Sequence, residues 1–205
     1  MVSSLRPASA EEDLKLAERC VAGERAAQRI LFHRERRLVH ATLYRVLGAN
    51  EEMEDLVQTA FLEIFRSLRN YRGEASLATW VDRCTVRVAY RYLSRRKPSS
   101  SPIDPLFEVA EDVPSIEERT ISRQAMRRLY AILDRIDPVH RLAFALHAID
   151  GRPMEEVARI MEASLPATKA RVWRARQELE RRARRDRLLA DLLEIERDPD
   201  DGAET

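Results

Sequence analysis

A run of prolines and serines near the middle of the sequence divides an otherwise helix-favouring chain in two. Residues 98–105 read Pro-Ser-Ser-Ser-Pro-Ile-Asp-Pro. A helix cannot continue through them, because proline lacks an amide donor and restrains the residue before it. On both sides the sequence is rich in Ala, Leu, Arg and Glu, which are strong helix formers. We therefore predict an all-α fold with two small helical domains joined by a flexible linker.

Glycines mark the ends of the helices that we predict. The chain of 205 residues has only five glycines, at positions 23, 48, 73, 151 and 202, and glycine commonly ends a helix. The predicted helices span 11–22, 24–47, 51–69, 76–95, 115–135, 138–149, 153–161 and 165–187. The predicted divisions are a disordered N-terminus at 1–10, a first domain at 11–97, an acidic linker at 98–114, a second domain at 115–187 and an acidic tail at 188–205.

The spacing of glycine, histidine and cysteine excludes several classes of function. Because no two glycines lie close together, neither common phosphate-cradling loop can form, which removes most nucleotide-using enzymes. The four histidines are scattered without a carboxylate or cysteine at a ligand spacing, so we expect no metal, no cofactor and no enzyme activity. Cys20 and Cys84 are too few for a disulfide framework. With no apolar run near 18 residues and no secretory signal, we expect a cytoplasmic protein without membrane insertion.

The charges lie in blocks that the net charge of +1 conceals. Residues 50–63 carry five acids and no base, and residues 98–118 carry six acids and no base. Residues 83–97 carry six bases and no acid, and residues 169–187 carry nine bases against three acids. Such blocks create local fields suited to charged partners. A single block is usually a solvated helix face, but two basic blocks in two predicted domains favour nucleic acid.

The predicted helix at 76–95 has two contrasting faces. Apolar residues recur at Leu77, Val81, Cys84, Val88 and Tyr92, which places them on one buried face. On the opposite face, an aromatic residue is followed by arginines at helical spacing. This arrangement suits single-stranded nucleic acid, because bases stack on the ring and guanidinium groups meet phosphates. From the pattern alone, a core tryptophan with solvated arginines is equally consistent. The opposite stripe consists of Trp80, Arg83, Arg87 and Arg91.

A helix-turn-helix pattern lies near the C-terminus. The first helix follows Gly151, and Glu162-Ala163-Ser164 forms a short turn in which Ser164 can cap the next helix. Lys169, Ala170, Trp173 and Arg174 remain on the outer face of the second helix, which would enter the major groove. A helical hairpin with a solvated face remains an alternative.

The two halves together resemble the extracytoplasmic-function (ECF) sigma factors of bacterial RNA polymerase. The stretch Glu54-Asp55-Leu56-Val57-Gln58-Thr59-Ala60-Phe61-Leu62 is similar to the most characteristic segment of that family, and Tyr71-Arg72-Gly73-Glu74 and Ala78-Thr79-Trp80-Val81 follow at the expected spacing. In the second half, Lys169-Ala170-Arg171-Val172-Trp173-Arg174-Ala175-Arg176 is similar to the recognition helix of the fourth sigma domain. The resemblance covers roughly residues 11–187 and implies sigma domains 2 and 4.

The resemblance implies roles at the matched positions. Contact with the clamp helices of the largest polymerase subunit falls on Glu54, Asp55, Gln58, Leu62 and Arg66. Contact with the −10 element falls on Asn70, Tyr71, Arg72, Gly73, Ser76, Trp80, Arg83, Arg87 and Arg91. Contact with the −35 element falls on Ser164, Lys169, Ala170, Arg171, Trp173, Arg174 and Arg176.

Further partners and the location also follow from the resemblance. It implies promoter DNA, the flap of the second-largest polymerase subunit and an anti-sigma factor as partners. It further implies a protein that is monomeric when free and associated with the nucleoid when bound to polymerase.

Two departures and two competing functions accompany this resemblance. Pro166-Ala167-Thr168 stands where the family usually has Gly-Thr-Val, and Ala170 replaces a common serine, which leaves the preferred −35 sequence open. A helix-turn-helix regulator acting without polymerase explains 138–187 but leaves the 54–62 stretch without a purpose. A helical adaptor for protein partners alone is the third hypothesis.

Overall fold

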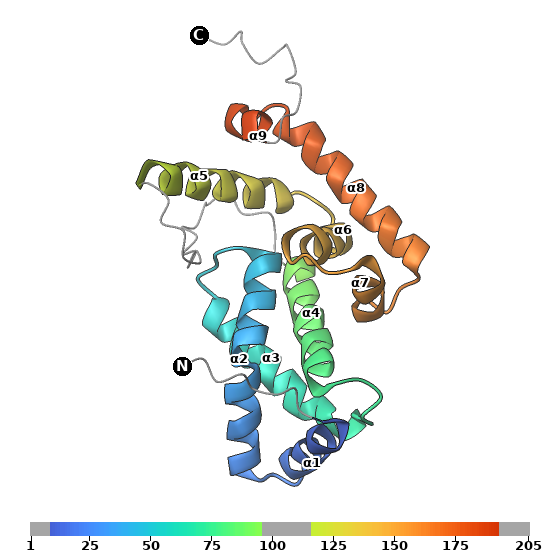
Figure 1. The fold of residues 1–205 in the computed structure, drawn as a ribbon. Helices are drawn as coiled ribbons and strands as arrows, with labels where there is room; N and C mark the ends of the chain where they lie inside the picture. Colours follow the sequence, from blue (N-terminus) through green and yellow to red (C-terminus); the bar gives the residue numbers. More distant parts are fainter. Residues whose placement is uncertain (1–8, 96–115, 193–205) are drawn as a thin grey trace. The chain divides into compact units, whose positions relative to one another are not determined.

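A computed structural model of the chain describes residues 9–95 and 116–192 (Figure 1). Within these ranges the chain is helical and contains no strand, which confirms the all-α prediction. The predictions for residues 1–8, for the linker at 98–114 and for residues 193–205 fall outside the described ranges.

Each predicted helix is present, with bounds that differ by a few residues. Most ends coincide with the predicted breaks, because the local signals for starting and stopping a helix act over short distances. The elements in chain order are α1 (Ala10–Val21), α2 (Arg25–Leu47), α3 (Met53–Ser67), the short 3-10 helix η1 (Leu68–Asn70), α4 (Leu77–Arg95), α5 (Ile116–Leu133), α6 (Pro138–Phe144), the π-helical segment η2 (Ala145–Ile149), α7 (Met154–Ile160), α8 (Leu165–Ala183) and α9 (Arg187–Leu192).

The C-terminal part departs from the prediction of one helix over 165–187 and a tail from 188. Helix α8 ends at Ala183, and a new helix, α9, begins at Arg187. Asp186 starts α9, because its carboxylate accepts the amide of Leu189 at 3.2 Å and a hydrogen bond from Arg128 at 2.8 Å. Leu189 and Ala190 are buried. The first residues of the predicted tail are therefore a packed part of the fold.

The predicted helix over 138–149 changes its winding partway. Its α-helical part ends at Phe144, and the next five residues form η2. The amide of Asp150 donates to the carbonyl of Ala145 at 2.8 Å, which is the five-residue step of a π-helix. Periodicity of apolar residues does not reveal one added residue per turn, so the sequence indicated a uniform helix.

Among the described residues, the first compact unit contains residues 9–43 and Glu52–Ala89. Its core is formed by the inner faces of α2, α3 and α4, with Leu31, Ile64 and Leu77 at 0% exposure. The Thr42 hydroxyl donates to the Asp82 carboxylate at 2.9 Å inside this core. Asp82 belongs to α4, whose buried face is thus wider than the apolar stripe predicted. The remaining surface of α4 is correspondingly narrow.

The second compact unit contains, of the residues that the structure describes, Tyr44–Glu51, residues 90–95 and residues 116–192. The last residues of α2 and of α4 thus belong to the second unit. Its apolar core includes Tyr130, Leu133, Ile136, Phe144, Ala175 and Leu179.

A buried arginine secures the segment Tyr44–Glu51 within the second unit. Arg141 is 1% exposed, and its guanidinium donates to the carbonyls of Val46 at 3.1 Å and Leu47 at 3.0 Å. It also pairs with Asp134. The guanidinium of Arg141 thus satisfies the carbonyls of Val46 and Leu47 at the end of α2, which have no partner within the helix.

Gly48 ends α2 in a conformation that a side chain would not fit. Its φ is +79°, and an added Cβ would lie 2.8 Å from the ring of Tyr130. The hydroxyl of Tyr130 in turn donates to the carbonyl of Arg45 at 2.9 Å. Glycine is therefore required here both by the left-handed backbone and by the close approach of the ring.

Candidate polymerase and nucleic-acid interfaces

One exposed line of residues runs along α3, and we call it the α3 stripe: Asp55, Gln58, Leu62 and Arg66. These residues are spaced three or four positions apart, so they share one face of the helix. Leu62 is 57% exposed although it is apolar, and the other three are also exposed. The guanidinium of Arg66 lies 3.8 Å from the carboxylate of Glu63. Asp55 and Gln58 form no hydrogen bond or ion pair within the described part of the chain. The four side chains are thus presented together to a possible partner.

Glu54 lies beside the α3 stripe and is also exposed. Its carboxylate pairs with Arg36 of α2 at 3.4 Å, and both side chains are more than half exposed. An exposed pair of this kind contributes little to stability. Glu54 is therefore available to exchange Arg36 for another cation.

The segment before α4 presents most of the residues predicted to contact the −10 element. Asn70, at the end of η1, and Arg72 and Ser76 are exposed, and Gly73 adopts a left-handed φ of +74°. The Ser76 hydroxyl accepts the amide of Thr79 at 3.2 Å and so caps the first turn of α4. The loop from 70 to 76 thus leads directly into the helix start.

Tyr71, which the resemblance places at the −10 element, is buried in the structure. It is 7% exposed, and its hydroxyl donates to the carbonyl of Ala75 at 2.7 Å. Burial raises the pKa of its phenol. The ring and the hydroxyl of Tyr71 both make contacts inside the protein. Tyr71 therefore holds the conformation of the loop. The sequence carried no signal for this, since an aromatic residue in a polar loop suits either location.

Trp80 packs against Tyr71 and is half-buried. Its ring meets that of Tyr71 edge to face, with centroids 5.6 Å apart, and its indole nitrogen donates to the Ser67 hydroxyl at 3.2 Å. The same hydroxyl donates to the carbonyl of Ile64 at 3.0 Å and lies 3.3 Å from the sulfur of Cys84. Trp80 is therefore held in one orientation, with part of its ring on the surface.

The three arginines of the predicted α4 stripe differ in exposure. Arg83 is half-buried, and its Nε atom is buried without a hydrogen-bond partner, whereas Arg87 and Arg91 are exposed. All three follow Trp80 at helical spacing, so they share its face of α4. The structure thus brings one aromatic surface and a line of cations together, as a single-strand interface requires.

The helix-turn-helix forms as the sequence predicted. Helix α7 ends at Ile160, the turn passes through Glu162 with a left-handed φ of +51°, and the Ser164 hydroxyl accepts the amide of Ala167 at 3.3 Å to cap α8. Thr168, Ala175, Leu179 and Ala183 form the buried side of α8. The opposite side of the helix is thereby directed outward.

The outer face of α8 carries the residues predicted to read the −35 element. Trp173 is 61% exposed, and Lys169, Ala170 and Arg174 are exposed beside it. Lys169, Arg171 and Arg174 have no ion pair in the ranges that the structure describes. Arg176 lies 3.5 Å from Glu180. The N-terminal half of α8 therefore offers unneutralised cations around an exposed indole.

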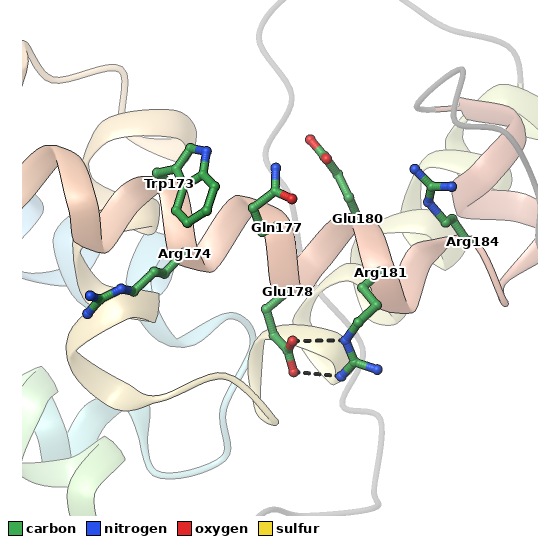
Figure 2. A pocket seen from close by; sticks show the side chains of 7 residues that line it. All are labelled: Trp173, Arg174, Gln177, Glu178, Glu180, Arg181 and Arg184. Atoms are coloured by element: carbon green, nitrogen blue, oxygen red, sulfur yellow. Dashed lines mark hydrogen bonds and ion pairs between the residues drawn. The ribbon is translucent and has the colours of Figure 1, made fainter.

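The C-terminal half of α8 is more nearly neutral (Figure 2). Arg181 forms two hydrogen bonds with Glu178, at 2.9 and 3.0 Å, and Arg182 also pairs with Glu178. The hydrogen bond from Arg181 is the main cause that lowers the pKa of Glu178, so this carboxylate stays ionised. A shallow hollow along this face is lined by Trp173, Arg174, Gln177, Glu178, Glu180, Arg181 and Arg184. The positive field of α8 is thus strongest near its N-terminus.

No group of three or more His, Cys, Asp or Glu side chains is placed to hold a metal within residues 9–95 and 116–192. Over the same ranges no helix is long and apolar enough to cross a membrane. Cys20 and Cys84 are both buried, and no disulfide joins them. The exposed surfaces on α3, α4 and α8 are suited to binding.

Family models match the chain in the two places where these surfaces lie. The model for Sigma-70 region 2 matches residues 31–98, and the model for Sigma-70 region 4 matches residues 126–179. The first match covers α3 and α4, and the second covers α7 and most of α8.

Known relatives extend the similarity over most of the chain. The "ECF RNA polymerase sigma-E factor" of Haemophilus influenzae is 29% identical over 180 residues, covering 82% of this chain and 93% of the relative. The protein of the same description from Escherichia coli K12 is 28% identical over 177 residues, covering 82% and 92%.

Solved structures share the fold at lower identity. CnrH, solved in complex with the cytosolic domain of CnrY, has a TM-score of 0.58 at 22% identity and covers 87% of this chain and 99% of its own. The sigma factor RpoE of Bartonella quintana, solved with the anti-sigma factor NepR, has a TM-score of 0.50 at 16% identity, covering 82% and 98%.

Helical surfaces of this kind, with matches to regions 2 and 4, define a sigma-70 family protein of transcription initiation. Within that family the chain belongs to the extracytoplasmic-function sigma factors.

Proposed function

We propose that this alternative sigma factor binds core RNA polymerase through the α3 stripe and Glu54. The observation that carries the proposal is Leu62, which is apolar and 57% exposed within a line of exposed polar residues, of which Asp55 and Gln58 form no hydrogen bond or ion pair in the described part of the chain. An exposed leucine between an amide, Gln58, and a cation, Arg66, suits a helical partner with complementary polar groups, here the clamp helices of the largest subunit. The buried centre of such an interface supplies most of its energy.

The loop at 70–76 and the α4 face form the proposed site for the unpaired −10 strand. A base leaving the duplex costs a few kcal/mol of stacking. Stacking on Trp80 and phosphate contacts with Arg87 and Arg91 would offset that cost. Arg83 is half-buried, so only the tip of its guanidinium would contribute.

The N-terminal half of α8 forms the proposed −35 interface. Lys169, Trp173 and Arg174 lie where a recognition helix meets base edges, and Arg171 and Arg176 flank them towards the phosphates. Ser164 caps the first turn of α8, at the end of the helix that would enter the groove. Ala170 offers only a methyl group, which suits close approach to the groove.

Several further features of the proposed function rest on the family. We propose that the second unit also meets the flap of the second-largest subunit, and that an anti-sigma factor covers the same surfaces in the inactive state. The protein would be cytoplasmic, monomeric when free and associated with the nucleoid through polymerase. It would have no enzyme activity, metal or cofactor of its own.

Transcription with purified core polymerase tests the central proposal. We expect the wild-type protein to form a stable complex with core enzyme and to start transcription from a cognate promoter. The Leu62→Ala variant should bind core polymerase about tenfold more weakly, the range of a moderate interface hot spot, and Asp55→Ala should weaken it as well. Glu18→Ala removes one exposed acid from α1 and serves as the matched control. Failure of the wild-type protein to bind core enzyme would refute the proposal.

The stand-alone regulator remains the second candidate, because the helix-turn-helix would suffice for it. It predicts tight binding of the isolated protein to one duplex sequence and no dependence on Leu62. Equal promoter affinity of wild type and Leu62→Ala in the absence of polymerase, together with failure to bind core enzyme, would favour it.

A further inference from the structure

A buried carboxylate from the first helix holds the start of α4. Asp13 lies in α1 and is 3% exposed. Its Oδ2 atom accepts a hydrogen bond from the backbone amide of Leu77 at 2.8 Å, across 64 positions of the sequence. Leu77 is the first residue of α4, so its amide has no partner within the helix. A distant helix thus supplies the capping group that Ser76 alone cannot provide.

The carboxylate is itself fixed from the other side. Its Oδ1 atom lies 2.9 Å from a guanidinium nitrogen of Arg34 in α2, and the Nε atom of Arg34 donates to the Glu35 carboxylate at 2.8 Å. Asp13 and Glu35 are both buried, so these interactions are little screened by solvent. A carboxylate held between a cation and the N-terminus of a helix is stabilised by both.

The same helix also borders the loop before α4. An added Cβ at Gly73 would lie 3.9 Å from the side chain of Leu14, the neighbour of Asp13. The hydrogen bond from Tyr71 to Ala75 closes the loop. At the junction of the loop with α4, Ser76 and Asp13 each supply a capping group.

We infer that Asp13 is a positioning residue for strand capture, because it fixes the junction between the 70–76 loop and α4. It does not itself reach DNA, since it is buried. It sets where Trp80 stands relative to the exposed residues of the loop, one helical turn from the capped amide. This inference rests on the proposed −10 function of these residues.

Substitutions at Asp13 separate a cap from a merely structural carboxylate. In Asp13→Ala the Leu77 amide loses its acceptor, whereas in Asp13→Asn the side-chain oxygen can still accept that bond. Glu11→Ala is the matched control, because Glu11 is an exposed acid of the same helix whose partner, Lys15, is also exposed. Full-length variants would be compared in complex with core polymerase and a cognate promoter.

We expect Asp13→Ala to give about tenfold less promoter opening, read from permanganate reactivity of the −10 thymines, in line with the loss of one helix cap. Its affinity for core polymerase should stay within about twofold of wild type, because the α3 stripe is untouched. Asp13→Asn should restore most of the opening. Glu11→Ala should behave as wild type.

A second measurement needs neither polymerase nor DNA. Hydrogen exchange of the Leu77 amide, followed by NMR in the free protein, should be about tenfold faster in Asp13→Ala and nearly unchanged in Asp13→Asn. If wild-type holoenzyme opens no promoter, the proposed function fails, while this exchange measurement still decides whether Asp13 caps α4.

Three results would overturn the inference. The first is promoter opening by Asp13→Ala equal to that by Glu11→Ala. The second is Asp13→Asn as defective as Asp13→Ala, which would mean that the charge matters and the cap does not. The third is an equal loss of core binding and opening in Asp13→Ala, which would indicate general unfolding of the first unit.

Discussion

Replacement of Tyr71 distinguishes a loop anchor from a direct DNA contact. Tyr71 is 7% exposed, and its hydroxyl holds the carbonyl of Ala75 at 2.7 Å. The variant Tyr71→Phe removes only that hydroxyl and keeps the ring against Trp80. The variant Tyr71→Ala removes the ring as well. The two hypotheses predict opposite patterns for this pair of variants.

The structure sets the size of each effect. Loss of one hydrogen bond costs about 1 kcal/mol, so Tyr71→Phe should loosen the loop and reduce promoter opening about fivefold. Loss of a buried aromatic ring costs about 3–5 kcal/mol. Because domains of this size are stable by only about 5–15 kcal/mol, Tyr71→Ala should be markedly destabilised even without DNA.

Two assays are sufficient. Urea unfolding followed by tryptophan fluorescence measures stability, and permanganate reactivity of the −10 thymines measures opening by holoenzyme. A base-stacking role would instead leave Tyr71→Phe fully active, since the ring is retained, and would leave Tyr71→Ala stable but inactive. That second pattern would refute the role of Tyr71 as a buried anchor.

Three further predictions concern other parts of the molecule. Trp173→Ala should leave the unfolding free energy within about 0.5 kcal/mol of wild type, as usual for surface positions, but weaken holoenzyme binding to −35 DNA about tenfold; anisotropy with a labelled promoter measures this, and unchanged affinity would contradict the assigned interface. Arg141→Met should cost about 3–5 kcal/mol, because it strands the buried partners of the guanidinium; a loss under about 1 kcal/mol in urea unfolding would count against that account. Burial raises the pKa of Glu35 above its usual 4.5, so the native state binds this proton more tightly than the unfolded chain does. The resulting stability is present below the ordinary pKa and is lost as pH rises through the raised one. The unfolding free energy of Glu35→Gln should lack that decline with pH. If the unfolding free energies of wild type and Glu35→Gln ran parallel across the pH range, this role of Glu35 would be excluded.

Local signals in the sequence were sufficient for the helices and for their outward faces. The line from Asp55 to Leu62 and the line from Lys169 to Trp173 each lie on one exposed face, because helical spacing alone decides which side chains point the same way. The cap at Ser164 was likewise visible, since capping depends on residues three positions apart.

Contacts between helices were not visible in the sequence. Asp13 and Arg141 are charged residues that composition would place on the surface, yet both are buried because each meets backbone groups from a distant helix. Tyr71 is buried within the loop that the resemblance places at the −10 element, and residues 188–192, predicted as the start of a tail, form most of α9. For Asp13 and Arg141 the deciding partner lies far along the chain, where periodicity carries no information, whereas Ala75 and Trp80, the partners of Tyr71, are near it in sequence but meet it only through the shape of the loop.

The short helix α9 determines where this chain can be shortened. Its residues Leu189 and Ala190 are 3% and 1% exposed, and α9 packs against α5 and α8. A fragment that stopped at Ala183 would uncover the apolar surface beneath them and invite aggregation. A purification tag or fluorescent reporter joined after Leu192 would instead keep all of α9 in place. Leu192, and not the end of α8, is therefore the earliest safe terminus for a working fragment.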